Sequence, residues 1–255
     1  MLTQDQIESF HKNGYLLVPG ILTAQEIAFM RKRILDIFDT GEWKRSPYNT
    51  DNVLSDVYSY FPEFIDITLK EKVRSAITSL LGNKPILMPE TAIHKGFYTG
   101  WHKDTTMQEK AGYHFHKDPR SLMIEAGFYL QDNDEWGGGL TVMEGSHITE
   151  DTFIENTHYD FTFLERVKRK LSGQSQDMTK RVNPHRHRVV DIPSKAGDLV
   201  IFNLKTNHRA TAPPNEDFSR VPKDRTKIAF FNAFSSNNPT ANDYLAYIRT
   251  RPEPY

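Results

Sequence analysis

Two histidines and an aspartate are the residues of this chain whose types and spacing could perform metal chemistry. His102 and Asp104 lie in Trp101-His102-Lys103-Asp104, directly after an alternating stretch that ends at Gly100. His208 comes much later, just after the apolar run that begins at Leu199. Two imidazoles and one carboxylate bind one face of a divalent metal and leave other positions open for a cosubstrate and O₂, as in non-haem Fe(II) oxygenases. The sequence therefore indicates a metal-dependent enzyme.

The His-x-Asp pattern occurs three times, so its context has to decide between His102-Lys103-Asp104, His116-Lys117-Asp118 and His158-Tyr159-Asp160. Metal coordination tolerates only small errors in distance, so a ligand pair is expected at the end of a strand that the core holds in place. The first copy follows a strand pattern directly, whereas the second lies in a polar loop and the third precedes a predicted surface helix. We expect His102 and Asp104 to be the ligands, with His116 as the alternative.

The composition excludes several classes of protein. A net charge of -1 and an isoelectric point of about 6.8 give no basic field that would bind nucleic acid or an anionic membrane surface. The chain has no cysteine, which excludes disulfides and cysteine-bound metals, so any metal must be held by histidine and carboxylate. No signal peptide and no apolar run of membrane-spanning length is evident, so we expect a cytoplasmic protein. The length fits a single domain over residues 1–255.

Helices are expected before the candidate ligands. The first two begin with capping boxes and end at glycines: Thr3 with Gln6 and Gly14 for one, and Thr23 with Glu26 and Gly41 for the other. Apolar residues on one face of the second helix have the spacing of a helix that lies against a sheet: Ile27, Met30, Ile34, Ile37 and Phe38. A third helix is expected to end at Leu80-Leu81-Gly82.

Strand patterns dominate the rest of the chain. They are Tyr15 to Val18, Ile86 to Met88, Thr91 to Tyr98, Leu122 to Leu130, Leu140 to Met143, Val189 to Ile192, Leu199 to Phe202 and Ile228 to Phe234. A helical pattern from Phe161 to Leu171 interrupts them, and its basic residues are expected to face solvent. The stretch from Trp43 to Tyr60 has no clear period and is expected to be a loop over the site. Helices first and strands later indicate the α+β class, with a sandwich or barrel as the body.

Arg225 is the candidate for binding an anionic ligand beside the metal. It stands at the start of the last strand pattern, and a guanidinium suits bidentate binding of a carboxylate inside a protein. Arg220 lies nearby, but the strand start favours Arg225. The order of His-x-Asp, His and Arg along the chain is more specific than any of its parts.

These residues together resemble the phytanoyl-CoA dioxygenase family of Fe(II)- and 2-oxoglutarate-dependent oxygenases. The resemblance spans nearly the whole chain and rests on residues 2–20, Lys95, Trp101 to Asp104, Gly138 to His147, Gly197-Asp198, His208 and Arg225. It implies a double-stranded β-helix, the jelly roll of the cupins, with N-terminal and flanking helices. It also implies that His102, Asp104 and His208 bind Fe(II), while His147 is structural.

The resemblance also implies roles in binding the cosubstrate. Arg225 would pair with the distal carboxylate of 2-oxoglutarate, and Lys95 matches a lysine of the family that assists this binding. The family often has a hydroxyl residue where this chain has Ala210, so Thr211 becomes the candidate for a second contact to that carboxylate.

The activity implied by the resemblance is hydroxylation of an unactivated C–H bond of a small organic metabolite, using Fe(II), 2-oxoglutarate and O₂ and releasing succinate and CO₂. Related halogenases have glycine or alanine in place of Asp104, which favours hydroxylation over halogenation here and leaves desaturation, ring formation and epimerisation as open alternatives. Side chains near the motifs are candidate substrate contacts: Tyr98, Trp101, Phe128, Asn232 and Phe234. They suit a small or medium organic molecule, and the sequence leaves the oligomeric state open.

Two alternatives come from other functional classes. A cupin-like isomerase or hydrolase would use zinc or manganese at the same three residues without consuming O₂, and Arg225 would bind a carboxylate of its substrate. A non-catalytic β-sandwich binding protein would retain no metal. Succinate formation, O₂ consumption and metal content distinguish the three hypotheses.

Overall fold

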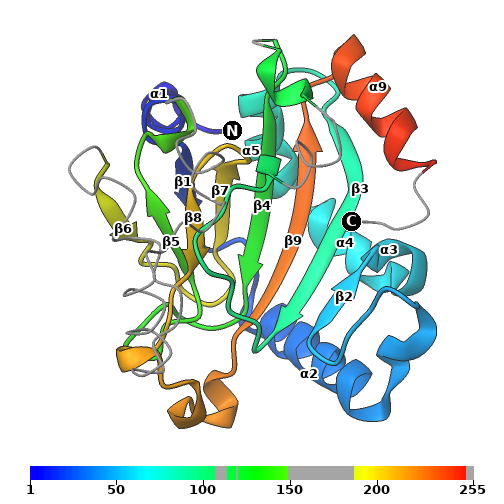
Figure 1. The fold of residues 1–255 in the computed structure, drawn as a ribbon, viewed down its shortest axis with the longest axis vertical. Helices are drawn as coiled ribbons and strands as arrows, with labels where there is room; N and C mark the ends of the chain where they lie inside the picture. Colours follow the sequence, from blue (N-terminus) through cyan, green and yellow to red (C-terminus); the bar gives the residue numbers. More distant parts are fainter. Residues whose placement is uncertain (107–113, 119, 149–186, 251–255) are drawn as a thin grey trace, which may run out of the picture.

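The computed structural model describes residues 1–106, 114–118, 120–148 and 187–250, and its body consists of two antiparallel β-sheets (Figure 1). The larger sheet has the strand order β1-β7-β4-β9-β3-β2, and the smaller sheet has the order β6-β5-β8. The strands are β1 Tyr15–Val18, β2 Val53–Ser55, β3 Ile86–Lys95, β4 Met123–Tyr129, β5 Leu140–Met143, β6 Val189–Asp191, β7 Leu199–Asn203, β8 His208–Ala210 and β9 Ile228–Ser235. This arrangement confirms the α+β class and the double-stranded β-helix.

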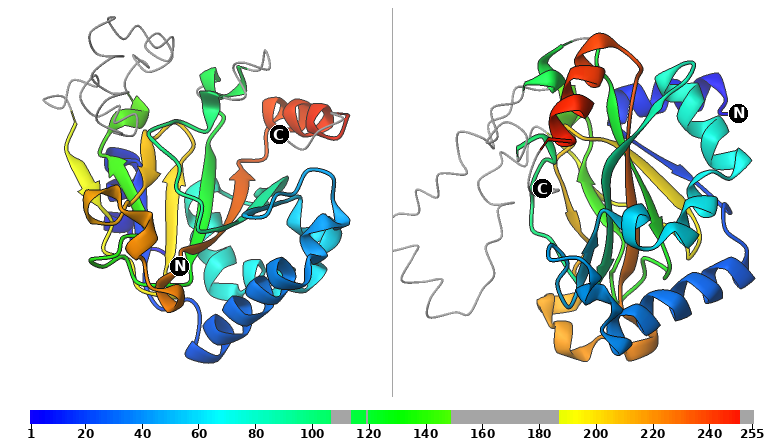
Figure 2. Two further views of the ribbon diagram at one scale, coloured as in Figure 1. Left: turned by 60° about the horizontal axis from the view of Figure 1, so that its bottom comes forward. Right: turned by 90° about the vertical axis from the view of Figure 1, so that its right-hand side faces the viewer.

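The two faces of the larger sheet have different partners. Its inner face packs against the smaller sheet, and this layer of the core contains Tyr129, Leu140, Val142, Ile192, Val200, Phe202 and Ala229. Its outer face packs against α2 and α5, and that layer includes Met30, Ile34, Ile77, Ile93, Phe128, Ile201 and Phe230. Figure 2 shows these helices on one side of the sheet. Both faces of the central strands are therefore buried, which removes the apolar and polar alternation of a half-exposed sheet.

The helices are α1 Gln4–Asn13, α2 Ala24–Thr40, α3 Val57–Tyr60, α4 Ile65–Thr68, α5 Glu71–Leu81 and α9 Pro239–Ile248. Helices α1 and α2 begin and end where the sequence predicted, and α5 ends at the predicted glycine. Both capping boxes form, at Thr3 for α1 and at Thr23 for α2. Gly14 and Gly41 end these helices in the left-handed conformation that glycine adopts without a steric penalty. Single turns of 3₁₀ helix connect other elements: η1 Glu42–Arg45, η2 Pro62–Phe64, η3 Phe115–Lys117, η4 Ser146–Ile148, η6 Pro214–Glu216, η7 Phe218–Arg220 and η8 Lys223–Arg225.

The prediction of a loop from Trp43 to Tyr60 was wrong in part. This stretch contains η1, β2 and α3, and β2 pairs with β3 at the edge of the larger sheet. The backbone N–H of Val57 donates to Thr91 Oγ1 at 2.8 Å, which ties α3 to the same strand. Strand β2 has only three residues, too few for an alternation of apolar and polar side chains to be visible in the sequence.

Other differences concern strand ends. The two predicted strands between Ile86 and Tyr98 are one strand, β3, whose register shifts between Leu87 and Thr91 and which ends at Lys95. Pro89 lies within this shift, where a residue without an N–H interrupts the ladder. The predicted helix from Phe161 to Leu171 lies outside the described residues.

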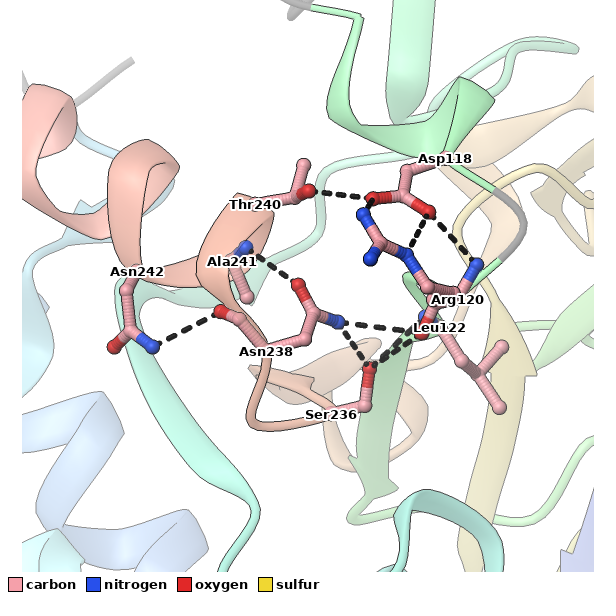
Figure 3. A network of polar contacts seen from close by, with 8 residues as sticks. All are labelled: Asp118, Arg120, Leu122, Ser236, Asn238, Thr240, Ala241 and Asn242. Atoms are coloured by element: carbon pink, nitrogen blue, oxygen red, sulfur yellow. Dashed lines mark hydrogen bonds and ion pairs between the residues drawn. The ribbon is translucent and has the colours of Figure 1, made fainter.

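Helix α9, which the sequence did not predict, is fixed to the start of β4 by a polar network (Figure 3). The side chain of Asn238 caps the helix by accepting from the N–H of Ala241, and its amide donates to the carbonyl of Arg120. Thr240 donates to Asp118 at 2.6 Å. Within the described part of the chain, no helix has both the length and the apolar character needed to cross a membrane.

Candidate metal centre

The backbone brings the two candidate histidines together. The N–H of His102 donates to the carbonyl of His208 at 2.9 Å, and the N–H of His208 donates to the carbonyl of His102 at 3.0 Å. His208 begins β8, where it pairs with Val142 of β5. The segment after β3 is thus hydrogen-bonded to the smaller sheet at His102, a residue whose position must be fixed if it is to bind a metal.

The side chains of His102, Asp104 and His208 converge on one point. Their possible ligand atoms all lie within 4.8 Å of one another. Asp104 Oδ1 is 3.5 Å from His102 Nε2 and 3.6 Å from His208 Nε2. Among the residues that the structure describes, these three form the group of side chains able to hold a metal ion. The side chain of His116 and the whole His158-Tyr159-Asp160 motif lie outside the described residues.

Backbone carbonyls determine which nitrogen of each imidazole is available. His102 Nδ1 lies 2.7 Å from the carbonyl oxygen of Gly100, and His208 Nδ1 lies 2.9 Å from that of Thr206. A carbonyl oxygen only accepts, so Nδ1 must carry the proton in both rings. Each Nε2 then presents a lone pair beside Asp104, and such bonds orient metal-binding histidines in general. The donor set therefore fits a divalent cation.

The electrostatics of His208 and Asp104 also suit the binding of a cation. Burial lowers the pKa of His208 to about 4. Burial opposes ionisation of Asp104, but the facing His208 and His102 outweigh it and keep the pKa of this carboxyl below its usual value. Asp104 Oδ2 is shielded from solvent and has no hydrogen-bond partner among the described residues. A carboxylate oxygen without a donor inside a protein is costly unless a ligand binds it.

The inner face of the larger sheet is open to solvent beside this group. In the otherwise buried strands β4 and β9, Glu125 and Phe231 remain partly exposed, and so does His94 of β3. His94 pairs with Ala229 and Glu125 pairs with Ala233, which places both side chains on the inner face. We call the partly exposed surface formed by these three residues and the metal group the chamber.

Lys227 is a buried cation at one end of the chamber. Only 2% of its surface is exposed, and its ammonium donates to the carbonyl of Phe97 at 2.6 Å. The ammonium also lies 5.4 Å from the centre of the Tyr98 ring. Burial lowers the pKa of Lys227 to about 7. Its charge in turn contributes to lowering the pKa values of His94 and His208, after the larger effect of burial.

The structure does not bring the predicted cosubstrate residues to the metal group. Arg225 forms an ion pair with Asp134. Lys95 points to the outer face, where its ammonium lies 4.4 Å from the centre of the Phe38 ring. Thr211 contacts other polar side chains, with its hydroxyl 2.9 Å from Thr141 Oγ1 and 3.3 Å from Asn133 Nδ2.

The predicted substrate contacts divide between the two faces. Tyr98 lies at the Lys227 end of the chamber, and Trp101 precedes His102 with its ring beneath Arg209 at 5.2 Å. The other three are in the outer layer: Phe128 and Phe234 belong to the core beneath the helices, and Asn232 accepts from Thr68 at 3.3 Å.

The sequence reasoning missed Glu125, His94 and Lys227. Glu125 and His94 are polar residues inside apolar strands, and that is the signal that could have found them. The sequence alone does not say which residues of a strand point to the inner face of the sheet, so this signal could not be interpreted.

The segment Gly145-Ser146-His147 contacts the chain neighbours of the two candidate histidines. Ser146 Oγ accepts from the N–H of Asn207 at 2.8 Å, and the carbonyl of Ser146 accepts from the ammonium of Lys103 at 3.2 Å. Asn207 and Lys103 are the chain neighbours of His208 and His102. His147 itself turns away, with Nε2 lying 3.0 Å from the carbonyl of His11. The segment therefore positions the two ligand-bearing stretches, and His147 has a structural place.

Comparisons with known proteins agree with this geometry. The family model for phytanoyl-CoA dioxygenase matches residues 10–221. An ectoine dioxygenase from Sphingopyxis alaskensis is 22% identical over 215 residues, covering 80% of this chain and 68% of that protein. Another, from Bordetella bronchiseptica, is 22% identical over 264 residues, covering 99% and 81%.

Solved structures share the fold. The structure of EctD from S. alaskensis with 2-oxoglutarate and 5-hydroxyectoine has a TM-score of 0.65 at 15% identity and covers 92% of this chain and 76% of that one. The carbocyclase SnoK from nogalamycin biosynthesis, described as non-haem and α-ketoglutarate dependent, has a TM-score of 0.61 at 16% identity and covers 92% and 84%.

Proposed function

Because the chain belongs to the phytanoyl-CoA dioxygenase family, we propose that His102, Asp104 and His208 hold its Fe(II). The protein is an Fe(II)- and 2-oxoglutarate-dependent dioxygenase, a non-haem iron hydroxylase that also uses O₂. The observation that carries the ligand assignment is the pair of carbonyls that accept from both Nδ1–H groups and leave both Nε2 atoms facing Asp104. We further propose that residues 1–255 form one such domain.

The residues of the chain have distinct tasks in this reaction. Bound Fe(II) and 2-oxoglutarate supply the activation of O₂ for C–H hydroxylation. The carbonyls of Gly100 and Thr206 fix the tautomers and orientations of the two imidazoles. Asp104 stays ionised and supplies the negative charge that balances part of the charge of the cation. The apolar layer between the sheets limits access of water to the site.

For the distal carboxylate of 2-oxoglutarate we propose Lys227 as the partner, with Arg225 as the second candidate. Lys227 faces the chamber and is buried, and its ammonium donates to the carbonyl of Phe97, which leaves further donors for a carboxylate. Arg225 is already neutralised by Asp134 and would have to exchange this partner for the cosubstrate. A carboxylate beside Lys227 would also compensate the cost of burying its charge.

Calorimetry of 2-oxoglutarate binding to the Mn(II)-loaded protein distinguishes these candidates. Lys227→Met should weaken binding by about 2 kcal/mol or more, roughly 30-fold in Kd, because it removes one partner of a buried charge pair. Lys95→Met is the matched control, since that lysine lies on the outer face of the same region. A large loss in Arg225→Met with little change in Lys227→Met would reverse the assignment.

The substrate that we propose is a small polar organic molecule. The support is that the curated relatives are named ectoine dioxygenases. Candidate metabolites are screened for stimulation of succinate release in the presence of Fe(II), 2-oxoglutarate and O₂. Metal-dependent turnover of a metabolite without O₂ consumption would instead support the isomerase or hydrolase hypothesis.

A further inference from the structure

The chamber has a basic end and an acidic end. Along β9 its inner face runs from the level of Lys227 through Ala229 and Phe231 to Ala233, which pairs with Glu125 of β4. At about 3.4 Å per residue, the levels of Lys227 and Glu125 are separated by roughly 20 Å of strand. A second carboxylate, Glu90 of β3, lies at the acidic end, where Tyr244 of α9 donates to its Oε1 at 2.7 Å.

Glu125 is a partly exposed residue whose carboxyl has no counter-charge among the described residues. Its Oε1 is shielded from solvent and has no hydrogen-bond partner among the described residues, and no ion pair joins it to a described basic side chain. Burial raises the pKa of Glu125 well above its usual value, and the charges of Asp104 and Glu90 raise it further. A carboxyl placed where other carboxylates repel its charge destabilises the fold, and such groups are concentrated at functional sites.

Neither the metal nor the cosubstrate accounts for this carboxyl. Among the described residues, the group able to hold a metal comprises His102, Asp104 and His208 and does not include Glu125. 2-Oxoglutarate is an anion, so its free carboxylate is attracted to Lys227, and near Glu125 it would further oppose the ionisation of that carboxyl. The remaining molecule that must enter the chamber is the substrate.

The surroundings of Glu125 suit an organic cation. Phe231, on the neighbouring strand β9, is partly exposed and lies on the same face of the sheet as Glu125. Gly127 allows this placement, because a Cβ there would lie 3.1 Å from Phe231 Cε1. An aromatic ring and a carboxylate facing one space are the groups that bind an ammonium or amidinium ion.

We propose that the substrate carries a positively charged nitrogen group, an ammonium or an amidinium, which Glu125 binds beside the Phe231 ring. The inference rests on the proposed function, because it needs the substrate to enter beside the metal group. It assigns the cosubstrate to the Lys227 end and the cationic group of the substrate to the Glu125 end. The carbon that reacts then lies between Glu125 and the metal group.

Matched probes test the charge preference directly. Benzamidine, benzamide and benzoate have nearly the same shape and are cationic, neutral and anionic. Each is titrated into the protein loaded with Fe(II) and 2-oxoglutarate under anaerobic conditions. We expect benzamidine to bind at least tenfold more tightly than benzamide, and benzoate to bind most weakly. Equal affinities, or a preference for benzamide or benzoate, would overturn the proposal.

Variants locate the effect. Glu125→Gln keeps the shape of the side chain and should reduce benzamidine affinity at least tenfold while leaving benzamide affinity within about twofold. Glu8→Gln, which removes an exposed carboxylate from α1, is the control and should change neither value. An unchanged affinity for benzamidine in Glu125→Gln would overturn the proposal. The thermal unfolding midpoint of each variant shows that it is folded.

If none of the three probes binds, a panel of ammonium, amidinium, neutral and anionic metabolites is tested for stimulation of succinate release. Stimulation of succinate release by cationic members supports the inference, and stimulation by neutral or anionic members alone contradicts it. The parent protein also has to consume 2-oxoglutarate with Fe(II). Failure of that reaction rejects the proposed function, whereas consumption without a preference for cations rejects only this inference.

Discussion

The uncompensated charge of Lys227 predicts that Lys227→Met makes the metal-free protein more stable. In the folded chain burial lowers the pKa of Lys227 to about 7 from 10.5. Each unit of difference corresponds to about 1.4 kcal/mol, so a difference of about 3.5 corresponds to about 5 kcal/mol as an upper value. Relaxation around the buried ammonium reduces this number, and we expect a gain of a few kcal/mol for the methionine variant at pH 7.

The gain should depend on pH with a defined sign. Above pH 10.5 the lysine is neutral in both the folded and the unfolded chain, so its charge costs nothing. Between pH 10.5 and about 7 the unfolded chain binds a proton that the folded chain does not, so the free energy of unfolding of the parent falls as the pH falls. Below about pH 7 the cost is constant. The advantage of Lys227→Met should therefore be largest at pH 6 to 7 and vanish towards pH 10.5.

Urea unfolding of the two proteins at several pH values between 6 and 10 measures this difference, because titrations common to both cancel. Lys95→Met is again the control, since it removes a lysine from the outer face. Mn(II) and 2-oxoglutarate together should stabilise the parent more than the variant. A stability difference that stays constant over the whole pH range would refute the uncompensated charge at Lys227.

Other changes have equally specific outcomes. His208→Ala should eliminate succinate formation and reduce the iron retained after purification, measured by metal analysis; full iron content in this variant would contradict the ligand assignment. Gly14→Ala should lower the free energy of unfolding by about 2 to 4 kcal/mol in urea, because φ is +85° and a Cβ would lie 2.5 Å from His147 Nδ1 and 2.6 Å from Thr206 Oγ1. A loss below about 1 kcal/mol would mean that these neighbours can move aside. Thr23→Ala should cost about 1 kcal/mol by removing the N-cap of α2, as seen in the thermal midpoint, and an unchanged midpoint would show that the cap is dispensable.

Several features of the protein were predictable because they depend on neighbours in the chain. The capping boxes at Thr3 and Thr23 and the glycine ends of α1 and α2 are local hydrogen-bond patterns, and they form as predicted. His102 and Asp104 could be singled out as candidate ligands because a short motif at the end of a strand needs no long-range information. The family resemblance depended on the order of motifs, and the family model matches residues 10–221.

The faces of the strands were not predictable in the same way. Phe128, Asn232 and Phe234 were expected near the substrate, but they point to the helix layer. In a strand that is buried on both sides, the residues of both faces are mostly apolar. The sequence therefore does not say which face points to the chamber. The same ambiguity concealed Glu125.

The sequence by itself determined the three candidate ligand residues, the bounds of α1 and α2 and the class of the fold, since each is encoded by residue type and short spacing. Only the tertiary structure decided which basic group and which carboxyl lie near the candidate metal group. Arg225 and Lys227 are separated by a single residue, yet one forms an ion pair with Asp134 and the other is buried beside Tyr98. Their places depend on how two sheets and a helix layer pack around β9, and that packing joins residues more than a hundred positions apart, such as Lys227 and Phe97.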